Sequence, residues 1–239
     1  MEFIAHRGLS GAAPENSATA FSLGMDRGLR WTELDVLFTA DDVAVVCHDD
    51  HLLRFGHDLH ISERLWAELS DLDMGSWYAP EFSAERMLTL AEAIDLLAGR
   101  QTGVNIELKS ELFGQLGATR SQGLTQCVQQ ALKGGLQLVL SSFDPRLVGW
   151  CRTHCPEVPR AVLVEGPFAP AHEQLAELVG ASAIHLEDPH TSRKDVQRVR
   201  DMGLDCRVYT INDAQRAAEL AAWGCAGIFT DILVPGDLN

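Results

Sequence analysis

Short apolar segments rich in β-branched residues alternate with longer amphipathic segments along this 239-residue chain. Short apolar runs between turn residues are typical of buried strands, whereas apolar residues at intervals of three and four are typical of helices. The expected strands are Phe3–Ala5, Thr32–Val36, Gly103–Leu108, Gln137–Ser141, Arg160–Val164, Ala183–Leu186, Asp205–Tyr209 and Gly227–Phe229. The expected helices are Ser17–Gly28, Leu90–Ala98, Ser121–Lys133, Pro145–Cys155, Ala171–Val179, Ser192–Met202 and Asp213–Trp223. Eight strands interspersed with helices favour one α/β fold, a single TIM (β/α)8 barrel, over an open sheet.

The ends of several expected helices carry residues that favour helix termination. Glycine is common there because it adopts left-handed backbone conformations without steric cost. The glycines at these ends are Gly28, Gly99, Gly134, Gly180, Gly203 and Gly224. Asn212 is the expected N-cap of the last helix.

One region interrupts the alternation. An extra strand is expected at Val43–Cys47, and residues 49–87, rich in aromatic residues and histidines, follow it as a small insertion. The chain has no linker-like or low-complexity tract, and 46% of its residues are hydrophobic. We therefore expect one catalytic domain spanning residues 1–239.

Charge and cysteine content narrow the classes of partner and compartment. With 19 basic and 34 acidic residues, the formal charge is -15, which argues against nucleic acid or an anionic membrane surface as the main partner. No signal peptide or apolar run long enough for stable membrane insertion is visible. The six cysteines are dispersed and contain no Cys-x-x-Cys pair, so reduced buried thiols are expected. These features predict a soluble cytoplasmic protein.

Charged side chains gather where the expected strands end. In a strand, residues two apart point to the same side, so Glu33 projects with Asp35, and Glu107 projects with Lys109. Barrel enzymes place their chemistry at these carboxyl ends. Carboxylate oxygens suit a hard divalent cation, and the sequence therefore predicts a Mg²⁺ or Ca²⁺ site. The alternative is that these acids pair with neighbouring Arg and Lys side chains.

His6 and His48 also follow expected strands, and these strands are expected to flank the acidic site. A pair of histidines beside a metal site is able to act as general acid and general base on one phosphorus atom. Arg7 and Lys109 then either neutralise the carboxylates or hold phosphate oxygens. The residues His48 to His60 are rich in His and Asp, and we favour a solvated insertion loop over a second metal site there.

The sequence resembles the glycerophosphodiester phosphodiesterase family from its first expected strand to its last. The resemblance is carried by His6-Arg7-Gly8, Pro14-Glu15-Asn16-Ser17, Glu33-Leu34-Asp35-Val36, His48-Asp49, Asn105-Ile106-Glu107-Leu108-Lys109, Thr210-Ile211-Asn212 and Gly227-Ile228-Phe229-Thr230-Asp231. It implies a barrel with an insertion after the second strand. It also implies a divalent cation, magnesium or calcium, at the three carboxylates and an acid–base pair of histidines. Substrate contacts implied by the motifs fall on Arg7, Lys109, Asn16 and Tyr209.

The family's activity is hydrolysis of small-molecule glycerophosphodiesters to glycerol 3-phosphate and an alcohol. The implied mechanism has the glycerol 2-hydroxyl attack phosphorus while one histidine takes its proton and the other protonates the leaving alcohol. Phe55-Gly56, Tyr209 and Ala226 depart from residues that are common in the family, which affects the pocket wall more than the chemistry. A lysophospholipase D acting on lipids and a catalytically silent phosphate-binding barrel are the alternatives. The preferred alcohol, the metal, the role of each histidine and the oligomeric state stay open.

Overall fold

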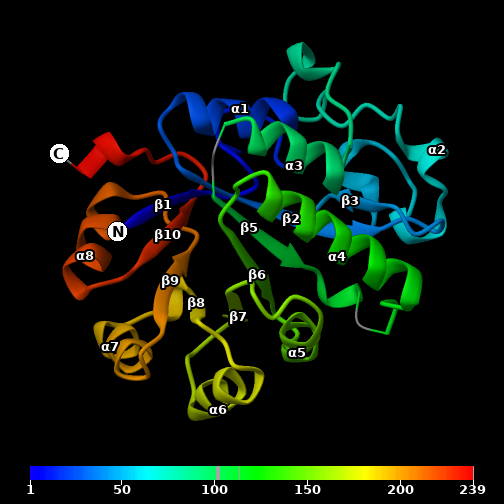
Figure 1. The fold of residues 1–239 in the computed structure, drawn as a ribbon. Helices are drawn as coiled ribbons and strands as arrows, with labels where there is room; N and C mark the ends of the chain where they lie inside the picture. The colour runs from blue at the N-terminus through cyan, green and yellow to red at the C-terminus, as the bar shows by residue number, and fades with distance from the viewer. Residues whose placement is uncertain (101–102, 113, 239) are drawn as a thin grey trace.

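The chain forms a closed ring of parallel strands surrounded by helices. The computed structural model describes residues 1–100, 103–112 and 114–238, and in this part of the chain eight parallel strands close because β1 pairs with both β2 and β10. In order around the ring they are β1 (Glu2–Ala5), β2 (Trp31–Phe38), β5 (Gly103–Leu108), β6 (Leu138–Ser142), β7 (Arg160–Val164), β8 (Ala183–Glu187), β9 (Asp205–Tyr209) and β10 (Gly227–Thr230). Figure 1 shows this ring with the helices outside it. The predicted TIM barrel is confirmed.

The helices that cover the ring begin and end close to the predicted positions. They are α1 (Ala18–Asp26), α3 (Leu90–Ala98), α4 (Ala118–Lys133), α5 (Pro145–His154), α6 (Pro170–Val179), α7 (Arg193–Asp201) and α8 (Ala214–Trp223). The start of α4 precedes the predicted start by three residues, because its first turn, Ala118 to Arg120, is mostly polar and lies outside the apolar pattern. Gly180 and Gly224 end α6 and α8 in the left-handed conformation that was expected of C-cap glycines.

The predicted N-cap of α8 was wrong by one residue. Asp213, not Asn212, caps the helix, and its carboxylate accepts a hydrogen bond from the Arg216 backbone N–H at 2.7 Å. The Asn212 amide instead donates to Asp231 at 2.6 Å. The side chain of Asn212 is therefore hydrogen-bonded to the loop after β10. The N-cap of α8 is instead Asp213, the residue directly before the helix.

Alternation along the strands separates two apolar layers. Ile184 and Leu186 of β8 pack in one buried cluster with Val196 and Val199 of α7. The residue between this pair, His185, faces the interior of the ring, as do Ala183 on the same strand and Ala161 on the neighbouring strand β7. The interior holds a small apolar cluster of Val139, Ala161 and Ala183, and it turns polar at Glu107, next to the carboxyl end of β5. This polarity places the candidate site at one end of the barrel.

The segment between β3 (Ala44–Val46) and β4 (Leu88–Thr89) packs on the barrel. β3 runs antiparallel to β2, and β4 pairs with β3. The short helices of the segment are η1 (Leu52–Phe55), η2 (Ile61–Glu63), α2 (Trp66–Leu69) and η3 (Pro80–Phe82). Leu52, Ile61 and Leu69 are fully buried in the cluster that lies under α3 and α4. In Figure 1 this segment extends from the β2 side of the ring.

All six cysteines lie in the described ranges and are unpaired, as predicted from their spacing. Among the described residues, no helix is both long and apolar enough to cross a bilayer.

We predict that Gly8 is required for packing of the loop after β1. A Cβ at this position would lie 2.7 Å from the Ala20 carbonyl carbon, and the backbone has a φ of +77°. Gly8→Ala should therefore lower the free energy of unfolding by about 2–4 kcal/mol, which combines backbone strain with overpacking. Gly28→Ala is the matched control, because its φ is +85° and nothing lies within 4 Å of the added Cβ. If urea unfolding shows that both variants lose the same free energy of unfolding, the packing role of Gly8 is contradicted.

Candidate active site

Three buried carboxylates converge at the carboxyl-terminal half of the barrel interior. Glu33 and Asp35 lie on β2, and Glu107 lies on the adjacent strand β5, where it pairs in register with Asp35. One oxygen from each carboxylate lies within 4.8 Å of the others. The exposed fraction of these three residues is between 1% and 8%. The sequence pattern thus predicted a cluster that the barrel does assemble.

Two cationic side chains offset part of this negative charge. Lys109 Nζ lies 2.9 Å from a Glu107 oxygen and 3.4 Å from an Asp35 oxygen, and Arg7 Nε lies 3.4 Å from the other Asp35 oxygen. Burial alone would raise the pKa of Asp35, but the charges of Lys109 and Arg7 hold it below its usual value. These ion pairs match the alternative in which the carboxylates are neutralised by neighbours. They neutralise the charge of Asp35 and part of the charge of Glu107.

Glu33 is not neutralised in the same way. Its Oε2 accepts a hydrogen bond from the Arg7 backbone N–H at 2.8 Å, whereas its Oε1 is buried without a hydrogen-bond partner. Burial, and then repulsion from Asp35 and Glu107, raises the pKa of Glu33 well above its usual value. Burial and the Asp35 charge raise the pKa of Glu107 to about 6. An unpaired buried carboxylate oxygen beside two further carboxylates fits the donor set of a hard divalent cation.

The loop after β1 is shaped to complete this cluster. Arg7 has a left-handed backbone conformation with a φ of 56°, which is uncommon for a residue with a side chain. In this conformation its backbone N–H contacts Glu33 while its guanidinium reaches Asp35 and Glu15. Asn16, also at a positive φ of 57°, donates from its amide to Asp35 at 2.9 Å.

His6 is anchored by a carboxylate from the opposite end of the chain. Its Nδ1 lies 2.8 Å from an Asp231 oxygen, and Asp231 also accepts from Ser10 Oγ and Asn212 Nδ2. Burial would raise the pKa of Asp231, but its hydrogen bonds, with His6 first, lower that pKa to about 2. Asp231 therefore stays ionised and holds the ring, leaving Nε2 for a reactant.

His48 is anchored in the same manner by its sequence neighbour. Its Nδ1 lies 2.6 Å from Asp49, and the second oxygen of Asp49 accepts from Arg54 Nε at 3.0 Å. Arg54 also donates two hydrogen bonds to Glu15, whose carboxylate accepts from Arg7. Burial lowers the pKa of His48. An ion-pair chain thus runs from the short helix η1 to the acidic cluster.

A cavity of about 430 Å³ opens between these groups. One wall is polar and is formed by the histidines and acids described above. The other wall is mostly apolar and includes Phe143, Leu163, Pro189 and Phe229. Tyr209 also lines the cavity, and its hydroxyl donates to the Val164 carbonyl at 2.7 Å. A site with two anchored imidazoles and an acidic cluster around one cavity has the parts for metal-assisted phosphoryl chemistry.

Comparison with known proteins assigns the family. The model of the glycerophosphoryl diester phosphodiesterase family matches residues 6–233. The chain belongs to this family. It is 34% identical over 237 residues to a putative glycerophosphodiester phosphodiesterase of Bacillus subtilis (strain 168), covering 97% of this chain and 94% of that protein.

Solved structures of the family have the same fold. A phosphodiesterase of Oleispira antarctica in complex with the product sn-glycerol-3-phosphate superimposes with a TM-score of 0.90 at 30% identity, covering 97% of this chain and 93% of that one. A putative glycerophosphoryl diester phosphodiesterase of Silicibacter pomeroyi gives a TM-score of 0.86 at 27% identity, with coverage of 100% and 91%. The family resemblance inferred from the motifs is confirmed.

The structure brings most of the residues predicted from the motifs to one cavity. Those that line it are His6, Arg7, Glu33, His48, Glu107 and Tyr209. Asp35 and Lys109 are linked to this group, because Lys109 Nζ contacts the carboxylates of both Asp35 and Glu107. Asn16 holds Asp35, so the described contacts place it beside a carboxylate. The predicted substrate contacts of Asn16, Lys109, Arg7 and Tyr209 all stay predictions.

Sequence reasoning missed several residues that shape the site. Asp231, Asp49 and Arg54 anchor the histidines, and the first two were visible as acids in the motifs but were assigned no role. Asn105 and His185 line the cavity from β5 and β8. The two-residue period of the strands was the available signal, because Asn105 shares a face with Glu107.

The His- and Asp-rich stretch forms local pairs. His51 and His60 stack with their ring centroids 4.4 Å apart, and they contact Asp58 and Asp50 respectively. Among the described residues, the only close group of three metal-ligating side chains is the one at Glu33. Most of the stretch is exposed or partly exposed, in keeping with a solvated loop, while Leu52 and Phe55 within it are buried.

We predict that Glu33→Gln abolishes tight binding of a divalent cation while leaving the metal-free protein at least as stable. The substitution removes one of three mutually repelling charges, so the metal-free melting temperature should rise. Mg²⁺ or Ca²⁺ at 100 times its Kd should stabilise the parent by about 2.7 kcal/mol but not this variant. Glu187→Gln is the control, since Glu187 lines the cavity outside the cluster and accepts from the Gly166 backbone N–H. If calorimetric titration shows that the parent and Glu33→Gln bind the cation with the same affinity, Glu33 is not a metal ligand.

Proposed function

We propose that the protein is a divalent-cation-dependent hydrolase that converts a glycerophosphodiester into glycerol 3-phosphate and an alcohol. The observation that carries this proposal is the common cavity of the buried acidic cluster and the two carboxylate-anchored histidines. The glycerol 3-phosphate complex of the Oleispira antarctica phosphodiesterase supports the substrate class. We take residues 1–239 as one catalytic barrel with residues 49–87 as its insertion, and its unpaired cysteines suit the reducing cytoplasm.

Glu33, Asp35 and Glu107 would hold the cation, either magnesium or calcium. When bound, such an ion polarises a phosphoryl oxygen and lowers the pKa of a nearby hydroxyl. Arg7 and Lys109 would then share their positive charge between the acidic cluster and the phosphate oxygens. Three carboxylates, a dication, two cationic side chains and a phosphodiester monoanion sum to about zero, so the occupied site would not bury a large net charge.

The two histidines would transfer protons on opposite sides of phosphorus. In each ring Nδ1 is held by a carboxylate, so proton transfer falls to Nε2. We assign His48 as the base that takes the proton of the glycerol 2-hydroxyl, because burial lowers its pKa and leaves it neutral at pH 7. His6 would protonate the leaving alcohol, and ionised Asp231 at its Nδ1 would stabilise the protonated ring before this transfer. Attack by the 2-hydroxyl would leave a cyclic phosphate, which water would then open, with His6 taking the proton of the water and His48 returning its proton to the 2-oxygen.

A lipid substrate is the second candidate, and exposed apolar side chains favour testing it. Leu53 is 59% exposed and Tyr78 is 36% exposed, and both lie in residues 49–87. The Tyr78 hydroxyl donates to the Gly11 carbonyl, in the loop that carries His6 and Arg7. A lysophospholipase D would need such apolar surface beside its pocket for an acyl chain.

We predict that the purified protein releases glycerol 3-phosphate from water-soluble glycerophosphodiesters such as glycerophosphocholine and glycerophosphoethanolamine. EDTA should abolish release, and added Mg²⁺ or Ca²⁺ should restore it. The measurement is an enzyme-coupled assay of glycerol 3-phosphate, run in parallel with lysophosphatidylcholine. Release of choline from the lysolipid alone would favour the lipid activity. Binding of a glycerophosphodiester without product, with either metal present, would favour a silent barrel and overturn the proposal.

We predict that Asp49 acts through His48. His48→Ala should lower kcat by about 10²–10⁴ if the imidazole transfers a proton. Asp49→Asn should lower kcat by about 10- to 100-fold with a smaller effect on KM, because the ring loses its charged anchor. Asp58→Asn is the matched control, since Asp58 makes the same kind of contact to His51 and is 88% exposed. If Asp49→Asn and Asp58→Asn have the same kcat, the positioning role is excluded.

A further inference from the structure

Buried polar atoms without a hydrogen-bond partner concentrate around the cavity. Among the described side chains, the cavity-lining atoms of this kind are Arg7 Nε, Glu33 Oε1, Asn105 Oδ1 and both ring nitrogens of His185. Such atoms cost free energy in a folded protein unless a bound group satisfies them. The first two belong to the acidic cluster and to the phosphate side of the proposed site. Asn105 and His185 belong to neither and require another explanation.

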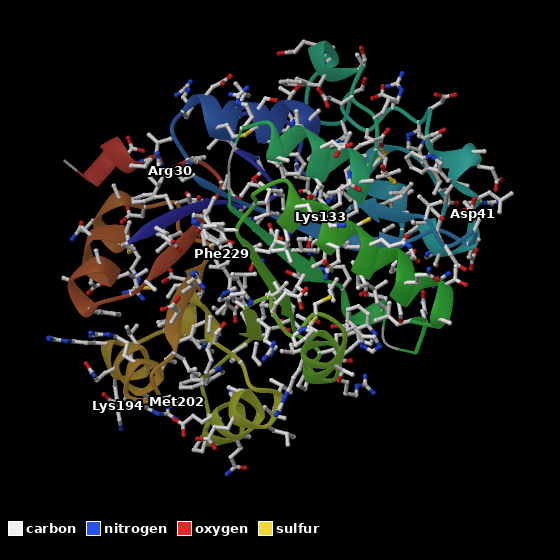
Figure 2. All side chains as sticks on the ribbon, in the orientation of Figure 1. Arg30, Asp41, Lys133, Lys194, Met202 and Phe229 are labelled. Atoms are coloured by element: carbon white, nitrogen blue, oxygen red, sulfur yellow. The ribbon has the colours of Figure 1, made fainter. Side chains whose placement is uncertain are left out.

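His185 lies at the closed end of the cavity. It is in the middle of β8, pairs in register with Leu163 and Arg207, and has no exposed surface. Its ring centroid is 4.9 Å from that of Phe229, which Figure 2 labels at the centre of the ring of strands. Burial, and then the Arg207 charge, lowers the pKa of His185 well below its usual value. The ring is therefore neutral and offers one N–H donor and one nitrogen acceptor.

Asn105 supplies a further acceptor on the other side of the barrel. Its amide nitrogen donates to Ser141 Oγ at 2.9 Å, which leaves its oxygen without a partner. Asn105 is two residues before Glu107 on the same face of β5, so it lies about 6.6 Å deeper along the strand. This depth matches the reach of a three-carbon polyol whose phosphate is held at the level of Glu107.

The chemistry of this closed end selects one kind of group. Asn105 and His185 together offer one donor and two acceptors and carry no charge. A hydroxyl both donates and accepts a hydrogen bond, so it satisfies such partners. A phosphate or carboxylate would lack sufficient donors there, and a quaternary ammonium group forms no conventional hydrogen bond. Apolar Leu163 and Phe229 beside them suit the carbon chain of a polyol.

We propose that Asn105 and His185 form a hydroxyl-binding subsite that recognises the terminal hydroxyl of the substrate's glycerol group and thereby selects polyol phosphodiesters. The inference rests on the proposed function and adds to it the residues that determine specificity. A site built to bind a hydroxyl discriminates against an analogue without it, because the buried partners then stay unpaired. His185 and Asn105 are in this account specificity residues and take no part in proton transfer.

The test compares glycerophosphocholine with its analogue 2-hydroxypropyl phosphocholine, which keeps the attacking 2-hydroxyl but lacks the terminal hydroxyl. With Mg²⁺ present, the parent should prefer glycerophosphocholine in kcat/KM by about 10- to 100-fold. His185→Leu should lose most of this preference by slowing glycerophosphocholine alone, and His185→Gln, which keeps a donor and an acceptor, should recover part of it. His154→Leu is the control, because His154 is exposed on α5 and stacks on Trp150.

Stability and binding measurements separate the possible failures. His185→Leu removes two unpaired buried nitrogens, so its melting temperature should equal or exceed that of the parent; a large fall would indicate a structural role and count against the proposal. Calorimetric binding of glycerol 3-phosphate and of 2-hydroxypropyl phosphate to the parent needs no turnover, so it tests the subsite even if hydrolysis fails. Equal affinity for these two phosphates, or an unchanged preference in His185→Leu, would overturn the subsite.

Discussion

Repulsion among Glu33, Asp35 and Glu107 is the interaction on which the rest of the site depends. Their oxygens lie within 4.8 Å of one another in the barrel interior, where like charges are weakly screened. Arg7 and Lys109 offset part of the repulsion, chiefly at Asp35. The remainder is concentrated on Glu33, whose unpaired oxygen and raised pKa give the cluster a donor set that a hard dication would fit. The barrel scaffold supplies the stability needed to keep these charges together.

The same barrel holds the two imidazoles in complementary ways. Asp231 directly follows the last strand, β10, and contacts His6, which directly follows the first strand, β1. The contact between them therefore depends on the pairing of β10 with β1 that closes the ring. The His48 contact instead depends on η1, where Arg54 bridges Asp49 and Glu15 and also packs over Phe55. The segment between β3 and β4 therefore contributes to the geometry of the site as well as to the surface around it.

Some site residues could be predicted from the sequence and others could not. The paired acids on β2 and the Glu–Leu–Lys pattern at the end of β5 were predictable, because a two-residue period on a buried strand dictates which side chains share a face. Asn105 obeys the same rule but was not recognised, since one amide on a strand is ordinary until its oxygen is found to lack a partner. The N-cap of α8 went to Asp213 because Asn212 is held by Asp231, a contact between segments that no local pattern contains.

The sequence by itself determined the barrel, the family and the identity of the charged residues at the strand ends, because periodicity and short motifs are local properties of the chain. Only the tertiary structure decided which carboxylate lacks a partner, which acids hold the histidines, and where a neutral His185 lies. These depend on strand register, ring closure and burial, which set distances between residues that are far apart in the chain. The pKa directions follow from those distances and from exclusion of water, and neither exists before the barrel closes.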